Sequence, residues 1–132
     1  MHKSENILSE SDWIKKLVNS KLSFRNYSYR GGYDLLHEPE VRNTKMEILF
    51  MENHDFQFIE TVETKHTRLG TDKKNSRTMN RIGTWSIVPE SPGKGILILC
   101  FIEKDSLEMK IEIDAKGHYW LDGHRYCLEK YL

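Results

Sequence analysis

The sequence is poor in cysteine and has no long hydrophobic run, and each of these absences excludes a class of protein. Two cysteines among 132 residues, Cys100 and Cys127, do not make a disulfide scaffold. Both lie in apolar strand patterns, so we expect two buried, unpaired thiols. No segment approaches the roughly 20 apolar residues that span a bilayer, and residues 1–6 lack the apolar stretch of a signal peptide. We therefore expect a cytoplasmic protein that does not bind membranes.

A net charge is also absent, which argues against polyanionic partners. Twenty Lys and Arg residues balance twenty Asp and Glu residues, so the formal net charge is zero. Residues 25–33 do interleave basic and aromatic side chains, as surfaces that stack nucleotides do. A strand followed by a Gly-Gly turn has the same composition, however, and the chain has one such segment. We expect no nucleic-acid partner.

The length and one amphipathic segment define the domain organisation. A chain of this size buries one hydrophobic core, so residues 1–132 should form a single domain. We expect residues 1–8 to be flexible and residues 9–20 to form a short amphipathic helix. Ser9 is a favourable N-cap, and Asp12 stands where a capping box requires an acid.

Residues 22–132 read as about eight short strands separated by turns, with no second helix to build parallel crossovers. The segment 96–102 is apolar at every position, so both of its faces should be covered, the outer one by the N-terminal helix. Asp122-Gly123 predicts a hairpin with a type I′ turn. Closure of such a meander removes both sheet edges. We therefore predict a mainly β fold, a single antiparallel up-and-down barrel with one external helix.

The tripeptide Gly83-Thr84-Trp85 within this meander resembles the calycin superfamily, the lipocalin-like and avidin-like barrels, whose signature includes Gly-x-Trp. The resemblance covers residues 22–132. In lipocalins and avidins the motif opens the first strand, whereas here it begins a strand past the middle of the chain. The resemblance implies a barrel mouth that holds a small, partly apolar molecule, and it invites comparison of Arg125 with the lipocalin arginine that packs over the tryptophan.

The leading hypothesis is accordingly a non-catalytic module that binds a small, partly apolar molecule. Trp85, Tyr119 and Trp120 are the expected aromatic residues at the pocket. Glu60 and Arg125 are the expected polar anchors. Glu60 falls on the apolar face of its strand, where a carboxylate needs a hydrogen-bonding partner.

Catalytic and metal motifs are not recognisable. His37 precedes Glu38-Pro39-Glu40, which is not a zinc-protease motif, and His118 and His124 form only a pair, whereas zinc needs three or four ligands. Neither cysteine has an activating charge nearby in the sequence. We expect no cofactor and no metal. A small cofactor-independent cyclase or isomerase, with Glu60 as its acid-base group, is a further hypothesis.

Residues 65–81 form a basic segment, with six Lys and Arg residues and one acid, Asp72. The segment is either a long hairpin that projects beyond the core or a loop, and the sequence leaves both open. Such a segment suits an acidic protein partner, while acids elsewhere in the chain would also allow self-association. A protein-interaction or regulatory accessory module is therefore the second hypothesis. Its predicted contact residues are Arg68, Lys73, Lys74 and Arg77.

Overall fold

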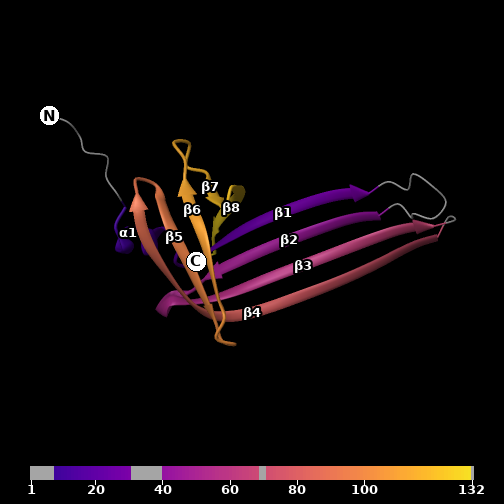
Figure 1. Ribbon diagram of the computed structural model, residues 1–132, viewed down its shortest axis with the longest axis horizontal. Helices are drawn as coiled ribbons and strands as arrows, with labels where there is room; N and C mark the ends of the chain where they lie inside the picture. The colour runs from indigo at the N-terminus through magenta and orange to yellow at the C-terminus, as the bar shows by residue number, and fades with distance from the viewer. Residues whose placement is uncertain (1–7, 31–39, 69–70, 132) are drawn as a thin grey trace.

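The computed structural model describes residues 8–30, 40–68 and 71–131 and shows a closed antiparallel β-barrel with one N-terminal helix (Figure 1). The elements in chain order are α1 (Glu10–Leu17), β1 (Ser20–Arg30), β2 (Glu40–Phe50), the 3₁₀ turn η1 (Glu52–His54), β3 (Asp55–Arg68), β4 (Thr71–Ser91), β5 (Lys94–Phe101), β6 (Ser106–Ile113), β7 (Tyr119–Leu121) and β8 (His124–Lys130). Each strand pairs with the next, and β8 pairs with β1. The predicted up-and-down barrel is confirmed.

The strands differ in length, and the extra length of β1 to β4 projects from the barrel (Figure 1). β4 is 21 residues long and changes partner along its course. It pairs with β3 from Thr71 to Thr84 and with β5 from Gly83 to Ser91. The protein thus has a closed barrel body and a four-stranded extension. We call the extension the projecting sheet; it consists of residues 24–30, 40–46, 60–68 and 71–79.

The change of partner takes place at Gly83, which pairs with Phe56 on β3 and with Phe101 on β5. A Cβ atom on Gly83 would lie 1.9 Å from the carbonyl oxygen of Cys100. Only glycine allows the two backbones to approach this closely. Two residues later, Trp85 is buried in the core. The Gly-Thr-Trp motif therefore marks the junction between the projecting sheet and the barrel body.

The core of the barrel body is built from alternate strand positions, as the two-residue period of a strand requires. The ring of Trp85 packs edge-on against Phe50, with centroids 4.9 Å apart. Phe56 makes a similar contact with Phe101 at 5.3 Å. Removal of each such side chain from water stabilises the fold by about 1.5–3 kcal/mol.

Helix α1 closes the core rather than covering the outer face of β5. The capping box is present, because the Ser9 side chain accepts from the Asp12 N–H at 3.1 Å and Asp12 accepts from the Ser9 N–H at 3.2 Å. Trp13 and Leu17 are fully buried. The Nε1 atom of Trp13 lies 3.5 Å from the position that a Cβ atom on Gly95 would take. The predicted placement on the outer face of β5 is wrong. Packing against the core allows the helix to bury more apolar surface than packing against that outer face would.

The end of β8 attaches the helix to the barrel. Lys130 Nζ donates to the carbonyl oxygens of Lys16 at 2.7 Å and Val18 at 3.0 Å, which lie at the carboxyl end of α1. Burial lowers the pKa of Lys130. The Tyr131 hydroxyl donates to the carbonyl oxygen of Phe50 at 2.7 Å. Helix carbonyls that lack partners within the helix are thus satisfied by a cation, which the helix dipole also favours.

The last hairpin has the predicted turn. Asp122 and Gly123 have φ angles of 47° and 82°, the two positive values that a type I′ turn requires. The Asp122 side chain accepts from the N–H of Lys110 at 2.8 Å, and the Asp122 N–H donates to the Lys110 carbonyl at 2.9 Å. These bonds tie the turn to β6.

The predicted burial of the cysteines is wrong. Cys100 and Cys127 are both exposed and unpaired. They occupy outward positions of β5 and β8, because inward positions such as those of Leu99 and Tyr126 supply the core. Ile102, just beyond β5, is 65% exposed, so this end of the apolar segment is not covered on both faces. Residues 1–7, on which the predicted flexibility mainly falls, lie outside the described residues.

We predict that Gly83→Ala strongly destabilises the protein, because its new Cβ forces β4 away from β5. The expected loss is about 3 kcal/mol in the free energy of unfolding, measured by urea denaturation. Gly117→Ala is the control, since Gly117 has a φ of 82° but nothing within 4 Å of its Cβ position. That variant should lose only about 1 kcal/mol. Equal losses would contradict the close approach at Gly83.

Candidate functional site

A concave pocket of about 550 Å³ lies on the projecting sheet. We call it the polar groove, because seven of its eight lining residues are polar. They come from β2, β3 and β4 and include two guanidinium groups and one carboxylate. The lining residues are Arg42, Thr44, Glu60, Val62, Thr64, Asn75, Ser76 and Arg77.

Strand register brings most of these side chains to one face of the sheet. Residues opposite each other on antiparallel strands point to the same side. The same face of β2 and β3 carries Ile48 and Phe58 nearer the barrel body, and both are buried in the core. The polar groove is therefore the continuation of the barrel interior beyond the packed core. Its two central rungs across β2, β3 and β4 are Thr44–Val62–Arg77 and Arg42–Thr64–Asn75.

Two charged side chains of the groove have no ionic partner in the described part of the chain. Glu60 is half-buried, and Arg77 is exposed. Neither makes an ion pair with a described residue, whereas Arg42 pairs with Glu40 at 3.2 Å. Glu60 stands opposite Met46 on one side and Met79 on the other. The groove thus offers a polar ligand one carboxylate and one guanidinium that form no ion pair with a described residue.

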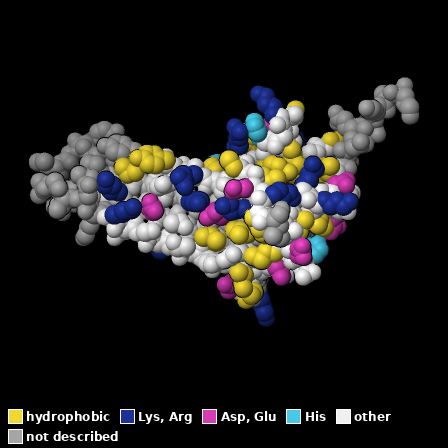
Figure 2. Space-filling model, turned by 180° about the vertical axis from the view of Figure 1, so that it is seen from behind, with side chains coloured by type: hydrophobic (Ala, Val, Ile, Leu, Met, Phe, Trp, Pro, Cys, Tyr) yellow, Lys and Arg dark blue, Asp and Glu magenta, His cyan; other side chains and the backbone are white. Residues whose placement is uncertain are grey.

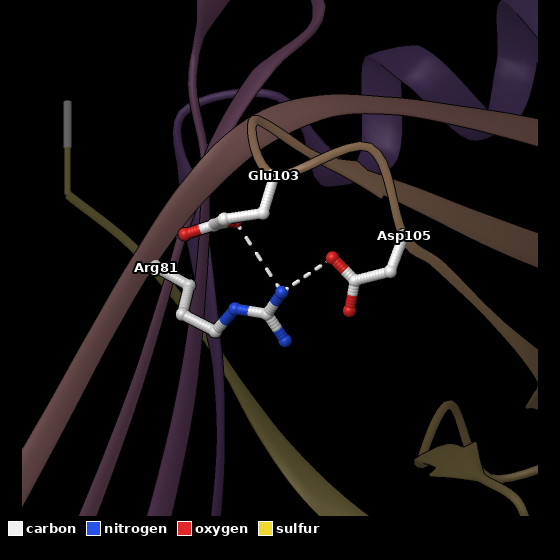
Figure 3. Close-up of polar contacts among 3 residues, drawn as sticks. All are labelled: Arg81, Glu103 and Asp105. Atoms are coloured by element: carbon white, nitrogen blue, oxygen red, sulfur yellow. Dashed lines mark hydrogen bonds and ion pairs between the residues drawn. The ribbon is translucent and has the colours of Figure 1, made fainter.

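Arg81 stands opposite the core residue Phe58 and contacts two carboxylates (Figure 3). Its guanidinium carbon lies 3.7 Å from the ring centroid of Phe101, a cation–π contact. Its Nη2 atom donates to Asp105 at 2.6 Å and to Glu103 at 3.3 Å, both on the turn between β5 and β6. The bond to Asp105 raises the pKa of Arg81, and Arg81 lowers the pKa of Asp105. Arg81 therefore covers the aromatic end of the core and fixes the adjoining turn.

The five predicted ligand-binding residues lie in three different places. Glu60 lines the polar groove, while Trp85 and Tyr119 are buried in the core. Trp120 and Arg125 are paired on β7 and β8 and point outward, since their neighbours along the strands point inward. The groove therefore contains one of the five. The arginine that covers an aromatic core ring is Arg81 rather than Arg125.

Arg42, Thr44, Thr64 and Asn75 were not anticipated from the sequence, although a signal was present. On the inward face of β2 the side chains change from apolar to polar between Met46 and Thr44. β4 shows the same change at this level, from Met79 to Arg77, whereas β3 changes one residue pair nearer the core, from Phe58 to Glu60. Such a change in neighbouring strands shows where the strands extend beyond the core. Polar residues on the inward face beyond that level are candidates for a binding site.

The four predicted partner-binding residues belong to the β3–β4 hairpin, so the segment 65–81 forms projecting strands, with residues 69–70 outside the described residues. Lys74 and Arg77 are exposed and point to opposite faces of β4. Arg68 and Lys73 lie on β3 and β4, and their side chains are outside the described part. In Figure 2, basic side chains are spread over both the projecting sheet and the barrel body, and hydrophobic ones gather mainly over the barrel body.

Asp114 organises the turn before β7. Its Oδ1 accepts from the N–H groups of Lys116 and His118, each at 2.9 Å, and its Oδ2 accepts from the indole of Trp120 at 2.9 Å. The bonds from Trp120 and the His118 backbone lower the pKa of Asp114 to about 2. The indole N–H of Trp120 is thus committed to a structural hydrogen bond.

Neither a cluster of metal-ligating side chains nor a helix that could span a membrane is found in the described part of the chain. No three His, Cys, Asp or Glu side chains gather there as a set that could hold a metal ion. The ring of His124 packs against Phe24 at 5.1 Å, and His37 lies outside the described residues. Nor does any helix among those residues have the length and apolar character needed to cross a membrane.

The chain matches no protein-family model, and comparisons with curated proteins and with solved structures found no match. The polar groove and the surfaces around it are thus the features of the molecule that bear on its function.

We predict that Asp114→Asn lowers the melting temperature at neutral pH. Because the folded pKa of about 2 is below the ordinary value of 3.8, Asp114 stabilises the fold above pH 4 and loses this effect as the pH falls through 2. The difference between the variant and the wild type, measured by circular dichroism, should therefore shrink from pH 4 to pH 2. Glu90→Gln removes an exposed carboxylate elsewhere and serves as the control. A constant difference for Asp114→Asn would contradict the prediction.

Proposed function

We propose that this protein is a non-catalytic binding module that holds a small anionic molecule in the polar groove. The observation that carries the proposal is Arg77, a guanidinium without an ionic partner among the described residues, at a pocket of about 550 Å³. Pockets for small molecules commonly measure about 300–1,000 Å³. The lining contains one carboxylate and no histidine, which is why we favour binding over acid-base catalysis.

The groove has suitable groups for an anion. A guanidinium presents a fork of donors that matches a carboxylate or phosphate. Arg42 and Arg77 lie on strands that flank β3, roughly 10 Å apart across the sheet, so their long side chains can approach one anion between them. The pair of Arg42 with Glu40 is partly open to solvent, since the Arg42 side chain is exposed, and a ligand can replace it. Thr64, on the strand between the two arginines, and Asn75, near Arg77 on β4, add neutral hydrogen-bonding groups.

Glu60 suggests the second feature of the ligand. Its carboxylate, a group that can only accept hydrogen bonds when ionised, lies at the end of the groove nearest the core. Met46 and Met79 flank it and offer apolar contact. We therefore expect an anion that carries a hydroxyl or amino group and a short apolar segment between the two ends.

A calycin-like origin is part of the same proposal. The closed eight-stranded meander and the Gly83-Thr84-Trp85 motif support it. The proposed site differs from a pocket inside the barrel, because Trp85 and other core side chains occupy the barrel body. A cytoplasmic location remains a prediction.

We test the proposal by thermal shift and calorimetry with inorganic phosphate, malate and phosphoserine. At least one of these anions should raise the melting temperature of the wild-type protein, because a ligand that binds only the folded state stabilises it. Arg77→Gln should weaken that binding at least about tenfold, the loss expected for one charge-assisted pair. Glu60→Gln should weaken binding of malate and phosphoserine but not of phosphate.

Arg25→Gln is the matched control for Arg77→Gln. Arg25 is exposed on β1 and does not line the groove. Its variant should bind as the wild type does. If none of the anions binds, or if both arginine variants bind equally, the polar groove is not the anion site.

A further inference from the structure

β4 has an open edge where it runs through the projecting sheet. On one side it pairs with β3, and its pairing with β5 on the other side begins only at Gly83. No other described strand pairs with this side. Every residue from 74 to 80 is exposed. We call residues 74–80 the open edge.

One backbone hydrogen bond shows which residues have main-chain groups directed toward the open edge. The carbonyl oxygen of Ile82 accepts from the N–H of Ile102, and therefore points to the β5 side. The register with β3 continues without a shift from Thr71 to Thr84, so main-chain directions alternate regularly along β4. The residues whose N–H and C=O groups point outward are thus Lys74, Ser76, Thr78 and Asn80.

The open edge lies in a basic stretch. Residues 71–81 contain four Lys and Arg residues and a single acid, Asp72. Arg81 is held by Glu103 and Asp105, but Lys74 and Arg77 make no ion pair with a described residue. Because Lys74 and Arg77 point to opposite faces of β4, a strand added at this edge meets positive charge on both of its faces.

We propose that the open edge of β4 binds an extended acidic segment of a partner protein, which adds a strand to the projecting sheet. Main-chain groups of the edge supply the hydrogen bonds, and Lys74 and Arg77 select carboxylates. A second copy of this chain is a poorer partner, because pairing two such edges brings two basic stretches together. The open edge shares Asn75, Ser76 and Arg77 with the lining of the polar groove, but strand addition uses the main-chain groups of the edge and does not depend on the proposed anion site.

Basic side chains on an edge strand also have a protective use, since charge discourages pairing with other chains. The two roles predict opposite results with an acidic peptide. We test them with a blocked nine-residue peptide of alternating Glu and Val, and with the same peptide carrying Lys in place of Glu. Binding to the full chain is followed by NMR.

The acidic peptide should bind, and the Lys peptide should not bind at about 1 mM. Hydrogen exchange should slow at the amides of the open edge that point outward. The amides of Asn75, Arg77 and Met79, already directed toward β3, should change little. This alternation would show that the peptide adds a strand rather than attaching through charge alone.

Thr78→Pro removes one outward N–H and leaves the pairing with β3 in place, as edge strands allow. This variant should weaken binding of the acidic peptide at least about tenfold, the loss expected when one main-chain hydrogen bond is removed and its acceptor is left unpaired. Thr78→Val keeps the N–H and the branched shape and should bind normally. Should Thr78→Pro fail to fold, Lys74→Glu provides the second test, with a similar expected loss.

Failure of both peptides to bind would assign the edge a protective role and overturn the proposal. Equal binding of both peptides, or unchanged binding by the variants, would also overturn it. Self-association of the free protein that Lys74→Glu alters would point to a second copy instead. Thr78 does not line the polar groove, so anion binding by its variants reports on the other site separately.

Discussion

The close approach of β4 to β5 at Gly83 allows one continuous strand to belong both to the barrel body and to the projecting sheet. On one side of this point β4 completes the barrel body, and on the other it extends the β1–β4 sheet without β5. Arg81, two residues away, holds the turn between β5 and β6 through Asp105 and Glu103. These contacts fix the point at which β5 separates from β4. The polar groove and the open edge both exist because β5 stops pairing here.

Much of the fold was predictable because its signals are local. The capping box of Ser9 and Asp12, the Asp122-Gly123 turn and the alternation of buried and exposed side chains each depend on residues close together in the sequence. The groove was not predictable in the same way. Thr44, Val62 and Arg77 become neighbours only through register, and one strand alone does not show where the core ends.

The wrong placement of the helix and the wrong burial of the cysteines have a common physical origin. Apolar segments indicate that a strand is partly buried, but they do not say which face the rest of the molecule will cover. The segment 96–102 suggested a covered outer face, yet Cys100 is exposed there, and Trp13 fills the core instead. A helix with a large aromatic residue can bury its apolar face inside the barrel as well as on the outer surface of the barrel, and its sequence pattern is the same in both cases.

The seam between β1 and β8 has a consequence for the order of folding. Only four residue pairs close the barrel, from Ser20 with Lys130 to Ser23 with Cys127, whereas β3 and β4 pair along fourteen. The seam joins the two strands that lie farthest apart in the sequence, so its closure costs the most chain entropy and gains only four residue pairs. The long hairpin forms from near neighbours and requires no such closure. Assembly should therefore proceed from the β3–β4 hairpin toward the seam, with the helix and the chain's last strand joining at the slowest step.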